Sequence, residues 1–347
     1  MKHLIKFSAL ALCVVLIGCG GGGGGGTGNT GGGGPAQSYT VTDLGTVTPN
    51  AINNTGQVVG TEHFPIGADH AFLWSGGVMR DLGTLGGSGS EALGINTAGQ
   101  VVGDADLPNG NTHAFLWSGG SMRDLGPLGG DYSEAFGVNT AGQVAGVADL
   151  PNGTTHAVLW DGGSMRDLGT LGGAFSWAAG INDTGQVAGE STLPNKAGHA
   201  FLWSGGTMQD LGTLGGYSSQ ANAINNTGQV VGTADLADGS HHAFLWSGGS
   251  MRDLGTLGGP NSWAYGINES GLIVGAAQLA DNSWHAVLWS GGAIQDLNSL
   301  IPAGSGWVLG GAAGVNKAGQ ICGVGTHNGV QRGFLLTPAS RSAKRPR

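Results

Sequence analysis

Apolar residues along most of this chain come in short runs that end at glycine or asparagine. The stretch "GINTAGQVVG", residues 94–103, places a polar tip of four residues between two apolar pieces. Asn at the first position of that tip and Gly at the fourth suit a type I turn, with the glycine free to adopt positive φ. The pattern predicts a β-hairpin. No stretch outside the N-terminal segment shows helical periodicity.

Two further hairpins are predicted near this one. "LPNG" or "LADG" forms a turn before the phrase "HAFLW", and the Gly-Gly of "FLWSGGSMRDL" permits a two-residue turn of type I′ or II′. The outcome is a meander of four antiparallel strands. A linker such as "GTLGGSGSEA" then leads into the next copy.

The whole unit repeats along the chain. "HAFLW" or a near variant begins every 43 residues, and a degenerate seventh copy, "RGFLLTP", begins at Arg332. Four-stranded repeats of this period are typical of propeller blades. We therefore predict an all-β fold, a seven-bladed β-propeller over residues 39–338. A parallel β-solenoid is the alternative, and it would require shorter coils and end caps.

The two ends of the repeat region support a closed ring. The last copy supplies three strands, around Val315, Ile321 and Phe334, and lacks the fourth. The counterpart of the missing strand is "YTVTDLG" at 39–45. Pairing of these segments in one blade would close the ring and remove the exposed edges of a linear stack.

The N-terminal segment reads as an export signal. Residues 1–18 have a basic start and a short apolar run, which suits a signal peptide rather than a membrane-spanning helix. "LIGC" at 16–19 resembles the lipobox of bacterial lipoproteins. That resemblance implies that Cys13 is removed, that Cys19 carries the lipid that anchors the chain to a membrane, and that the protein reaches the outer membrane or cell surface. Residues 19–38 then form a flexible glycine-rich tether.

Charge and cysteine content narrow the function classes. Of 13 basic residues, two lie in the first six positions and four in the last seven, which leaves 7 basic against 22 acidic residues between them. Such a body is unsuited to nucleic acid, whose phosphates require clustered Lys and Arg. The basic segment 339–347 is interpreted as a solvated tail. Cys322 is expected to be a core residue without a disulfide partner.

The repeats resemble the extracellular HAF repeat family, named for the His-Ala-Phe that recurs here from His70 to Phe244. The resemblance covers Tyr39 to Pro338. It implies an exported location, but the family brings no established activity, and no catalytic residue is carried over.

Three repeated side chains are interpreted as structural. The His of "HAFLW" is expected to bond a neighbouring turn or blade, the Asp of "DLG" to cap backbone N–H groups, and the Trp to pack between blades. The alternatives are a metal-binding ring of histidines, an acidic ring that attracts cations, and a calcium loop at "DADLPNG" (104–110) that lacks EF-hand spacing. We predict no metal and no cofactor.

Positions that break the repetition are the candidates for function, because scaffolded repeats carry function on variable loops. The sequence predicts that the linkers between "LGG" and "GIN" gather at one mouth of the channel. Unselected drift in tolerant loops would also explain their variation. The candidate ligand-binding residues are Glu91, Asp131, Tyr132, Glu134, Phe175, Trp177, Tyr217, Trp263, Tyr265 and Trp307.

Aromatic faces with a few carboxylates suit a carbohydrate or a peptide. The sequence therefore predicts a monomeric, non-catalytic binding or scaffolding module. A propeller enzyme acting on polysaccharide, with the acids at 91, 131 and 134, is one alternative, and a purely structural or adhesive surface protein is another. No nucleophile elbow, paired-His zinc helix, phosphate loop or CxxC motif occurs.

Overall fold

The structure is a computed structural model, and it describes residues 38–64 and 67–339. The predicted signal peptide, the Cys19 anchor and all but one residue each of the tether and the tail lie outside the described residues. Within them, no helix is long and apolar enough to span a membrane.

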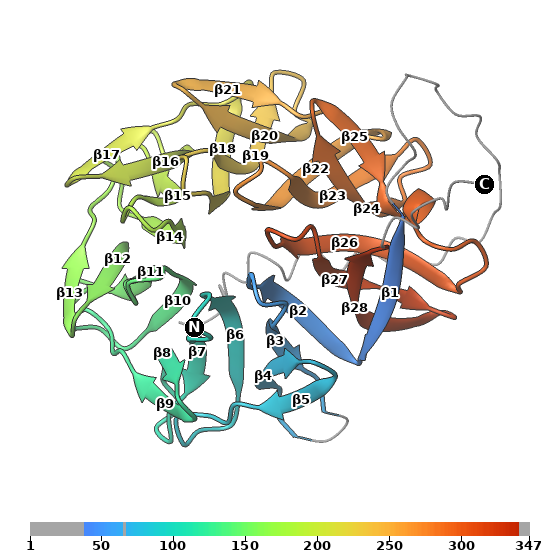
Figure 1. Cartoon of the computed structure of the whole chain (residues 1–347). Coiled ribbons are helices and arrows are strands. Elements are labelled where there is room, and N and C mark those ends of the chain that lie inside the picture. The colour runs from blue at the N-terminus through green and yellow to red at the C-terminus, as the bar shows by residue number, and fades with distance from the viewer. Residues whose placement is uncertain (1–37, 65–66, 340–347) are drawn as a thin grey trace.

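The described chain forms seven four-stranded antiparallel sheets arranged as a ring about a central axis (Figure 1). Blades 1 to 3 are β2 (Val47–Ile52), β3 (Val58–Glu62), β4 (His70–Ser75) and β5 (Val78–Asp81); β6 (Ser90–Ile95), β7 (Val101–Asp106), β8 (Thr112–Ser118) and β9 (Ser121–Asp124); β10 (Ser133–Val138), β11 (Val144–Asp149), β12 (Thr155–Asp161) and β13 (Ser164–Asp167). Blades 4 to 6 are β14 (Ser176–Ile181), β15 (Val187–Thr192), β16 (Gly198–Ser204) and β17 (Thr207–Asp210); β18 (Gly215–Ile224), β19 (Val230–Leu236), β20 (His241–Ser247) and β21 (Ser250–Asp253); β22 (Gly258–Ile267), β23 (Ile273–Leu279), β24 (Trp284–Ser290) and β25 (Ala293–Asp296). Blade 7 is β26 (Trp307–Val315), β27 (Ile321–His327), β28 (Val330–Pro338) and β1 (Tyr39–Gly45), and a short 3-10 turn at Leu297–Leu300 precedes it.

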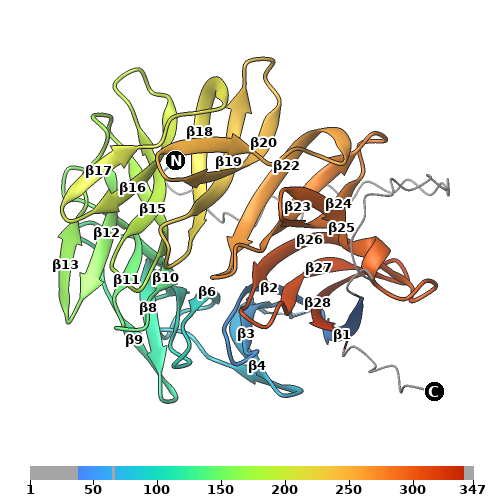
Figure 2. The same ribbon diagram turned by 45° about the horizontal axis from the view of Figure 1, so that its top comes forward.

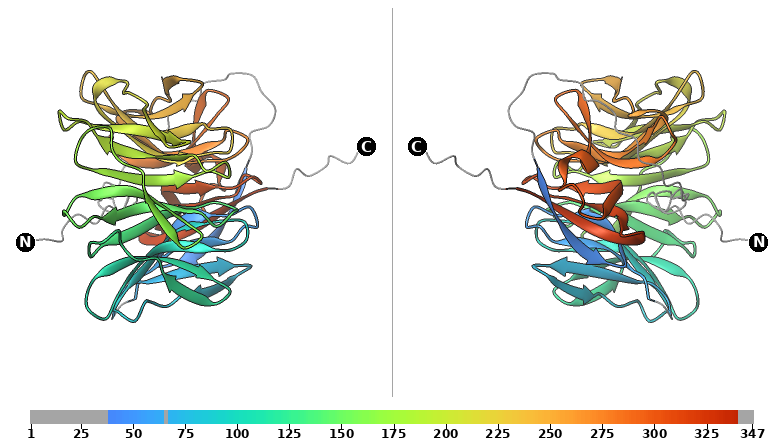
Figure 3. Two further views of the ribbon diagram at one scale, coloured as in Figure 1. Left: turned by 90° about the vertical axis from the view of Figure 1, so that its left-hand side faces the viewer. Right: turned by 90° about the vertical axis from the view of Figure 1, so that its right-hand side faces the viewer.

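The predicted seven-bladed propeller is confirmed, and the solenoid alternative is wrong. In each blade the first strand lies nearest the axis and the last lies at the rim (Figure 1). Figures 2 and 3 show the same ring obliquely and from two sides.

The turns have the chemistry that the sequence indicates. Gly76 and Gly77, with φ of 57° and 91°, join β4 to β5, and positive φ at both positions is the signature of a type I′ turn. In the first hairpin of blade 2, the Gly99 N–H donates to the Asn96 carbonyl at 3.0 Å, and Gly99 has φ of 78°. Glycine recurs at these places because a side chain there would be strained.

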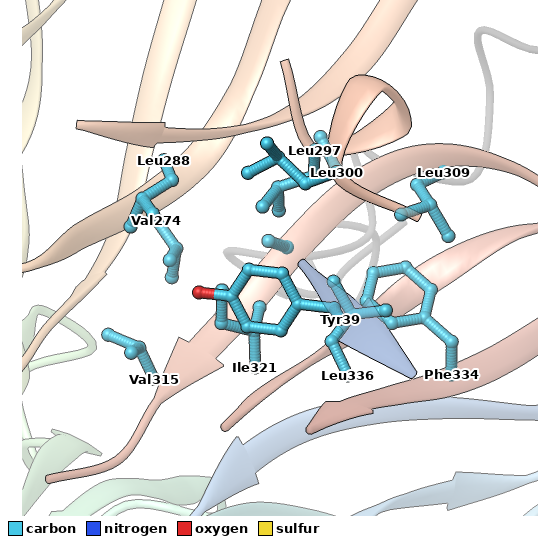
Figure 4. Close-up of a cluster of buried hydrophobic side chains, with 12 residues drawn as sticks. Tyr39, Val274, Leu288, Leu297, Leu300, Leu309, Val315, Ile321, Phe334 and Leu336 are labelled. Atoms are coloured by element: carbon cyan, nitrogen blue, oxygen red, sulfur yellow. The ribbon is translucent and has the colours of Figure 1, made fainter. Parts of the chain in front are cut away.

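Blade 7 closes the ring with strands from both ends of the chain. β1 pairs with β28 from Tyr39 opposite Pro338 to Asp43 opposite Phe334. The Tyr39 side chain is buried in a cluster that joins blade 7 to Val274 and Leu288 of blade 6 (Figure 4). The first strand is therefore held by main-chain pairing and by apolar burial, as predicted.

Neighbouring blades pack through their third strands. Trp117 of blade 2 packs with Leu73 and Leu82 of blade 1, and the Arg80 guanidinium lies 4.9 Å from the Trp117 ring centroid. The interpretation of the repeated Trp as inter-blade packing is confirmed. Cys322 is a buried core residue, as expected, and burial raises the pKa of its thiol to about 12.

A ring of asparagines links all seven blades at the end of the inner strands. The Nδ2 of each asparagine donates to the backbone carbonyl of the equivalent asparagine in the next blade, and Asn316 of blade 7 donates back to Asn53 of blade 1 at 3.1 Å. The ring comprises Asn53, Asn96, Asn139, Asn182, Asn225, Asn268 and Asn316. Because every member is buried, each bond lies out of reach of competing water.

We predict that Asn182→Ala lowers the free energy of unfolding by about 3 kcal/mol, because the change leaves several buried backbone groups unpaired. The Asn182 side chain donates to the Asn225 carbonyl and accepts from the Gln186 N–H at 2.9 Å. The matched control is Asn152→Ala, which removes an exposed turn asparagine and should cost about 1 kcal/mol or less. Urea unfolding measures both, and equal losses would contradict the role assigned to the ring.

Candidate binding site at the upper mouth of the channel

The inner strands leave little room at the axis. A Cβ on Gly94 would lie 2.5 Å from the Phe136 carbonyl of the next blade, so this position accepts no side chain without a shift. Just beyond it, a β-branched residue of every blade lines both an upper cavity of about 250 Å³ and a lower one of about 200 Å³. This ring, which separates the two cavities, comprises Ile52, Ile95, Val138, Ile181, Ile224, Ile267 and Val315.

We call the end of the channel where the inner strands begin the upper mouth. The predicted candidates gather around it, but their description as linker residues is wrong for most of them. Main-chain pairing extends further than expected, so the following candidates belong to inner strands: Glu91, Glu134, Trp177, Tyr217, Trp263, Tyr265 and Trp307. Asp131, Tyr132 and Phe175 precede such strands.

A buried aromatic cluster joins blades 3 and 4. Phe136, which the sequence reasoning missed, packs edge-on against Trp177 at 5.3 Å between ring centroids, with Tyr132 and Phe175 beside them. Trp177 is 3% exposed, so its ring is covered. The Tyr132 hydroxyl donates to Glu134, and burial together with the Glu134 carboxylate raises the pKa of Tyr132. The cluster is packing rather than an open surface.

The remaining outlying candidates lie apart from one another. Trp307 stacks on His327 within blade 7, Glu91 accepts a hydrogen bond from Asn50 at 3.0 Å, and Asp131 is exposed. Tyr217 is 60% exposed and donates its hydroxyl to the Asn195 carbonyl.

A third cavity, of about 340 Å³, brings two candidates together with polar residues of blade 5. We call it the 5–6 cleft because most of its lining comes from blades 5 and 6. Its lining comprises Glu190, Ser218, Ser219, Gln220, Asn222, Thr233, Asp235, His241, Trp263 and Tyr265. No aliphatic side chain is among them.

The aromatic and amide groups of the 5–6 cleft are held in fixed orientations. Trp263 stacks on Trp284 with 4.0 Å between ring centroids and 7° between planes. Gln220 Nε2 donates to Asn222 Oδ1 at 3.0 Å, and Asn222 Nδ2 donates to the Ala264 carbonyl at 2.8 Å. These contacts orient the groups before any ligand arrives.

The carboxylates of the cleft have different surroundings. Asp235 is engaged at both oxygens, by His241 Nδ1 at 2.6 Å and by the Ser218 N–H at 3.0 Å. Glu190 accepts from Trp177 Nε1 at 3.3 Å. Burial raises the pKa of Glu190, and the Trp177 bond and nearby His199 only partly offset this.

Glycine at position 198 makes room for Glu190. A Cβ there would lie 2.0 Å from Glu190 Oε1, whereas the equivalent residue of blade 6 is Trp284. The sequence reasoning missed Glu190 and the polar wall because it compared the copies chiefly before their opening phrase. The paired departure of Glu190 and Gly198 from the repeat was the available signal.

The repeated histidines and aspartates have structural roles, as expected. In blades 1 to 6 each His Nδ1 bonds the Asp of its own blade, for example His285 to Asp296 at 2.7 Å. In five of these blades the same Asp accepts the N–H of the glycine two residues on, as Asp81 does from Gly83. In blade 7, Arg332 and His327 pair with Asp43 of β1. Among the described residues, no group of three or more His, Cys, Asp or Glu is placed to hold a metal.

One hydrogen-bonded chain in blade 1 has the residue order of a nucleophile relay. Thr48 Oγ1 lies 2.8 Å from His63 Nε2, and His63 Nδ1 lies 2.8 Å from Asp69. The positions of His63 and Asp69 also hold a cross-strand hydrogen-bonded pair in blades 2, 3 and 5. Since Thr48 is buried, we interpret this chain as the blade 1 version of that pair.

A constant serine ties successive blades and was also missed. Ser90 Oγ of blade 2 accepts the Ala71 N–H at 2.9 Å and donates to the Gly83 carbonyl at 2.6 Å, both in blade 1. Ser176, Ser219 and Ser262 repeat both bonds. The serine stands beside the alanine that marks the variable segment, so it anchors each segment at a fixed place.

Solved structures similar to this chain are β-propellers. A puromycin-hydrolyzing peptidase from Mycobacterium tuberculosis shares 14% identity at a TM-score of 0.59, covering 87% of this chain and 53% of its own. The β-propeller domain of the Trilobed protease from Pyrococcus furiosus, which has an open velcro topology, shares 11% identity at a TM-score of 0.52, covering 73% of this chain and 84% of its own. Aleuria aurantia lectin aligns at 13% identity with a TM-score of 0.42, covering 75% and 98%.

These similarities show the fold alone, and this chain spans about half of the peptidase. No protein-family model matches the chain, and no curated protein matches it in sequence. The resemblance to the HAF repeat family therefore stays a prediction.

The His–Asp pairs predict how stability depends on pH. Burial acts to raise the pKa of Asp296, but the bonds from His285 and the Asn298 N–H outweigh it and the pKa is lowered. The carboxylate therefore stabilises the fold above its unfolded pKa of about 3.9, and this contribution is lost as pH falls through the lower folded value. We expect the free energy of unfolding to fall below about pH 4, and to fall less in Asp296→Asn. Urea unfolding between pH 2 and 6 tests this, and equal slopes for the two proteins would refute it.

Proposed function

We propose that this protein is a non-catalytic binding module that holds a saccharide in the 5–6 cleft. One observation carries the proposal: Trp263, fixed against Trp284, shares a cavity with oriented amide, hydroxyl and carboxylate groups. An aromatic face packs on the apolar face of a sugar ring, while polar groups bind its hydroxyls. A peptide suits the cleft less well, because the lining has no aliphatic pocket for an apolar side chain.

The proposal of a non-catalytic role rests on the surroundings of the acids considered for catalysis. Glu134 is buried against Tyr132, Glu91 bonds Asn50, and Asp131 is exposed. A glycosidase needs two carboxyl groups facing one bond of its substrate. These three acids have separate partners, which favours binding over hydrolysis.

We further propose that the propeller is exported and works as a monomer held at the outer membrane or cell surface. The support is in the sequence: "LIGC" at 16–19 with Cys19 as the lipid carrier, and the glycine-rich residues 19–38 as the tether. The acidic body favours a ligand other than nucleic acid.

The test is a pair of aromatic substitutions at the same mouth. Trp263→Ala should weaken binding of a soluble oligosaccharide such as cellotetraose by at least about tenfold, because it removes the stacking face. Tyr217→Ala is the matched control, since Tyr217 is exposed but does not line the cleft. Calorimetry on both variants and the wild type measures the effect. Unchanged affinity in Trp263→Ala, or equal loss in the control, would reject the cleft as the site.

A further inference from the structure

The charge of the 5–6 cleft is one-sided, and its meaning rests on the proposed function. Glu190 and Asp235 both line the cleft, and none of its ten lining residues is Lys or Arg. His241 is committed to Asp235, so it leaves Glu190 without a cationic neighbour from that pair. Among the described residues, Glu190 forms no ion pair.

Glu190 is the carboxylate that lacks adequate compensation. Burial raises its pKa, Oε2 receives one long hydrogen bond from Trp177, and Oε1 lies over Gly198. Removing a carboxylate from water is costly unless charge or good hydrogen bonds replace the water. By contrast, Asp235 has short partners at both oxygens.

The aromatic lining adds a second preference for positive charge. The faces of Trp263 and Tyr265 carry the negative end of the ring quadrupole and attract cations. Stacking on Trp284 holds the Trp263 ring in place. A neutral sugar would use the stacking face but leave Glu190 uncompensated.

We propose that the ligand is an amino saccharide with a free, protonated primary amine, which pairs with Glu190 in the 5–6 cleft. Oligosaccharides of glucosamine belong to this class. N-acetylation removes the charge and adds bulk, so it should abolish the preference. The cleft thus selects by charge as well as by stacking.

The experiment is calorimetry on the full chain near pH 6 with glucosamine tetramer, its N-acetylated form and cellotetraose. We expect the amine-bearing tetramer to bind at least about tenfold more tightly than the two neutral ones. Glu190→Gln should remove that difference and leave cellotetraose binding unchanged. The matched control is Glu269→Gln, which removes an exposed carboxylate at the lower cavity and should keep the preference.

The outcomes separate the two proposals. Equal affinity for all three sugars would overturn the amine proposal and leave saccharide binding intact. Binding of none would overturn both. If Glu269→Gln reduces the preference as much as Glu190→Gln, net charge rather than the cleft attracts the amine, and the proposal fails. The comparison of acetylated and free tetramers uses the wild-type protein, so it decides even if Glu190→Gln does not fold.

Discussion

The fold depends on one repeated hydrogen bond, from the side chain of a buried asparagine to the backbone of the next blade. Each blade gives one such bond and receives one, so the ring has no end. The same asparagine also satisfies the turn that follows its strand, as Asn182 does for the Gln186 N–H. Local turn chemistry and inter-blade contact are therefore met by a single side chain, which explains why the ten-residue phrase recurs so faithfully.

A frame fixed in this way allows variation at the opposite mouth. Trp177 and Trp263 hold the same position in blades 4 and 6. Trp177 meets Phe136 and Val147 of the preceding blade and is buried. At the positions of Phe136 and Val147, blade 5 presents Asn222 and Thr233, and there a cleft with a tryptophan wall forms instead. The candidate site thus arises from polar substitutions in one blade opposite an aromatic residue of the next.

The comparison of these two tryptophans also shows what the sequence could predict. The 43-residue period, the turn glycines and the split last blade determine the architecture, because each is a local or end-to-end pattern. Burial at the mouth depends on residues of the neighbouring blade, some 40 positions away, so Trp177 and Trp263 looked alike. Glu190 escaped notice for the same reason, since its place in the cleft wall depends on the glycine at 198 and on the blades that follow.

The account treats closure of the ring as the condition for every other contact. Deletion of Ser38–Gly45 removes the strand that completes blade 7, together with Tyr39 and the Asp43 carboxylate that pairs with Arg332. The most direct measurement is thermal unfolding of this deletion variant, followed by tryptophan fluorescence and circular dichroism. The account predicts loss of the single cooperative transition, with all seven blades affected. A variant that melts as one unit at the temperature of the intact protein would contradict it.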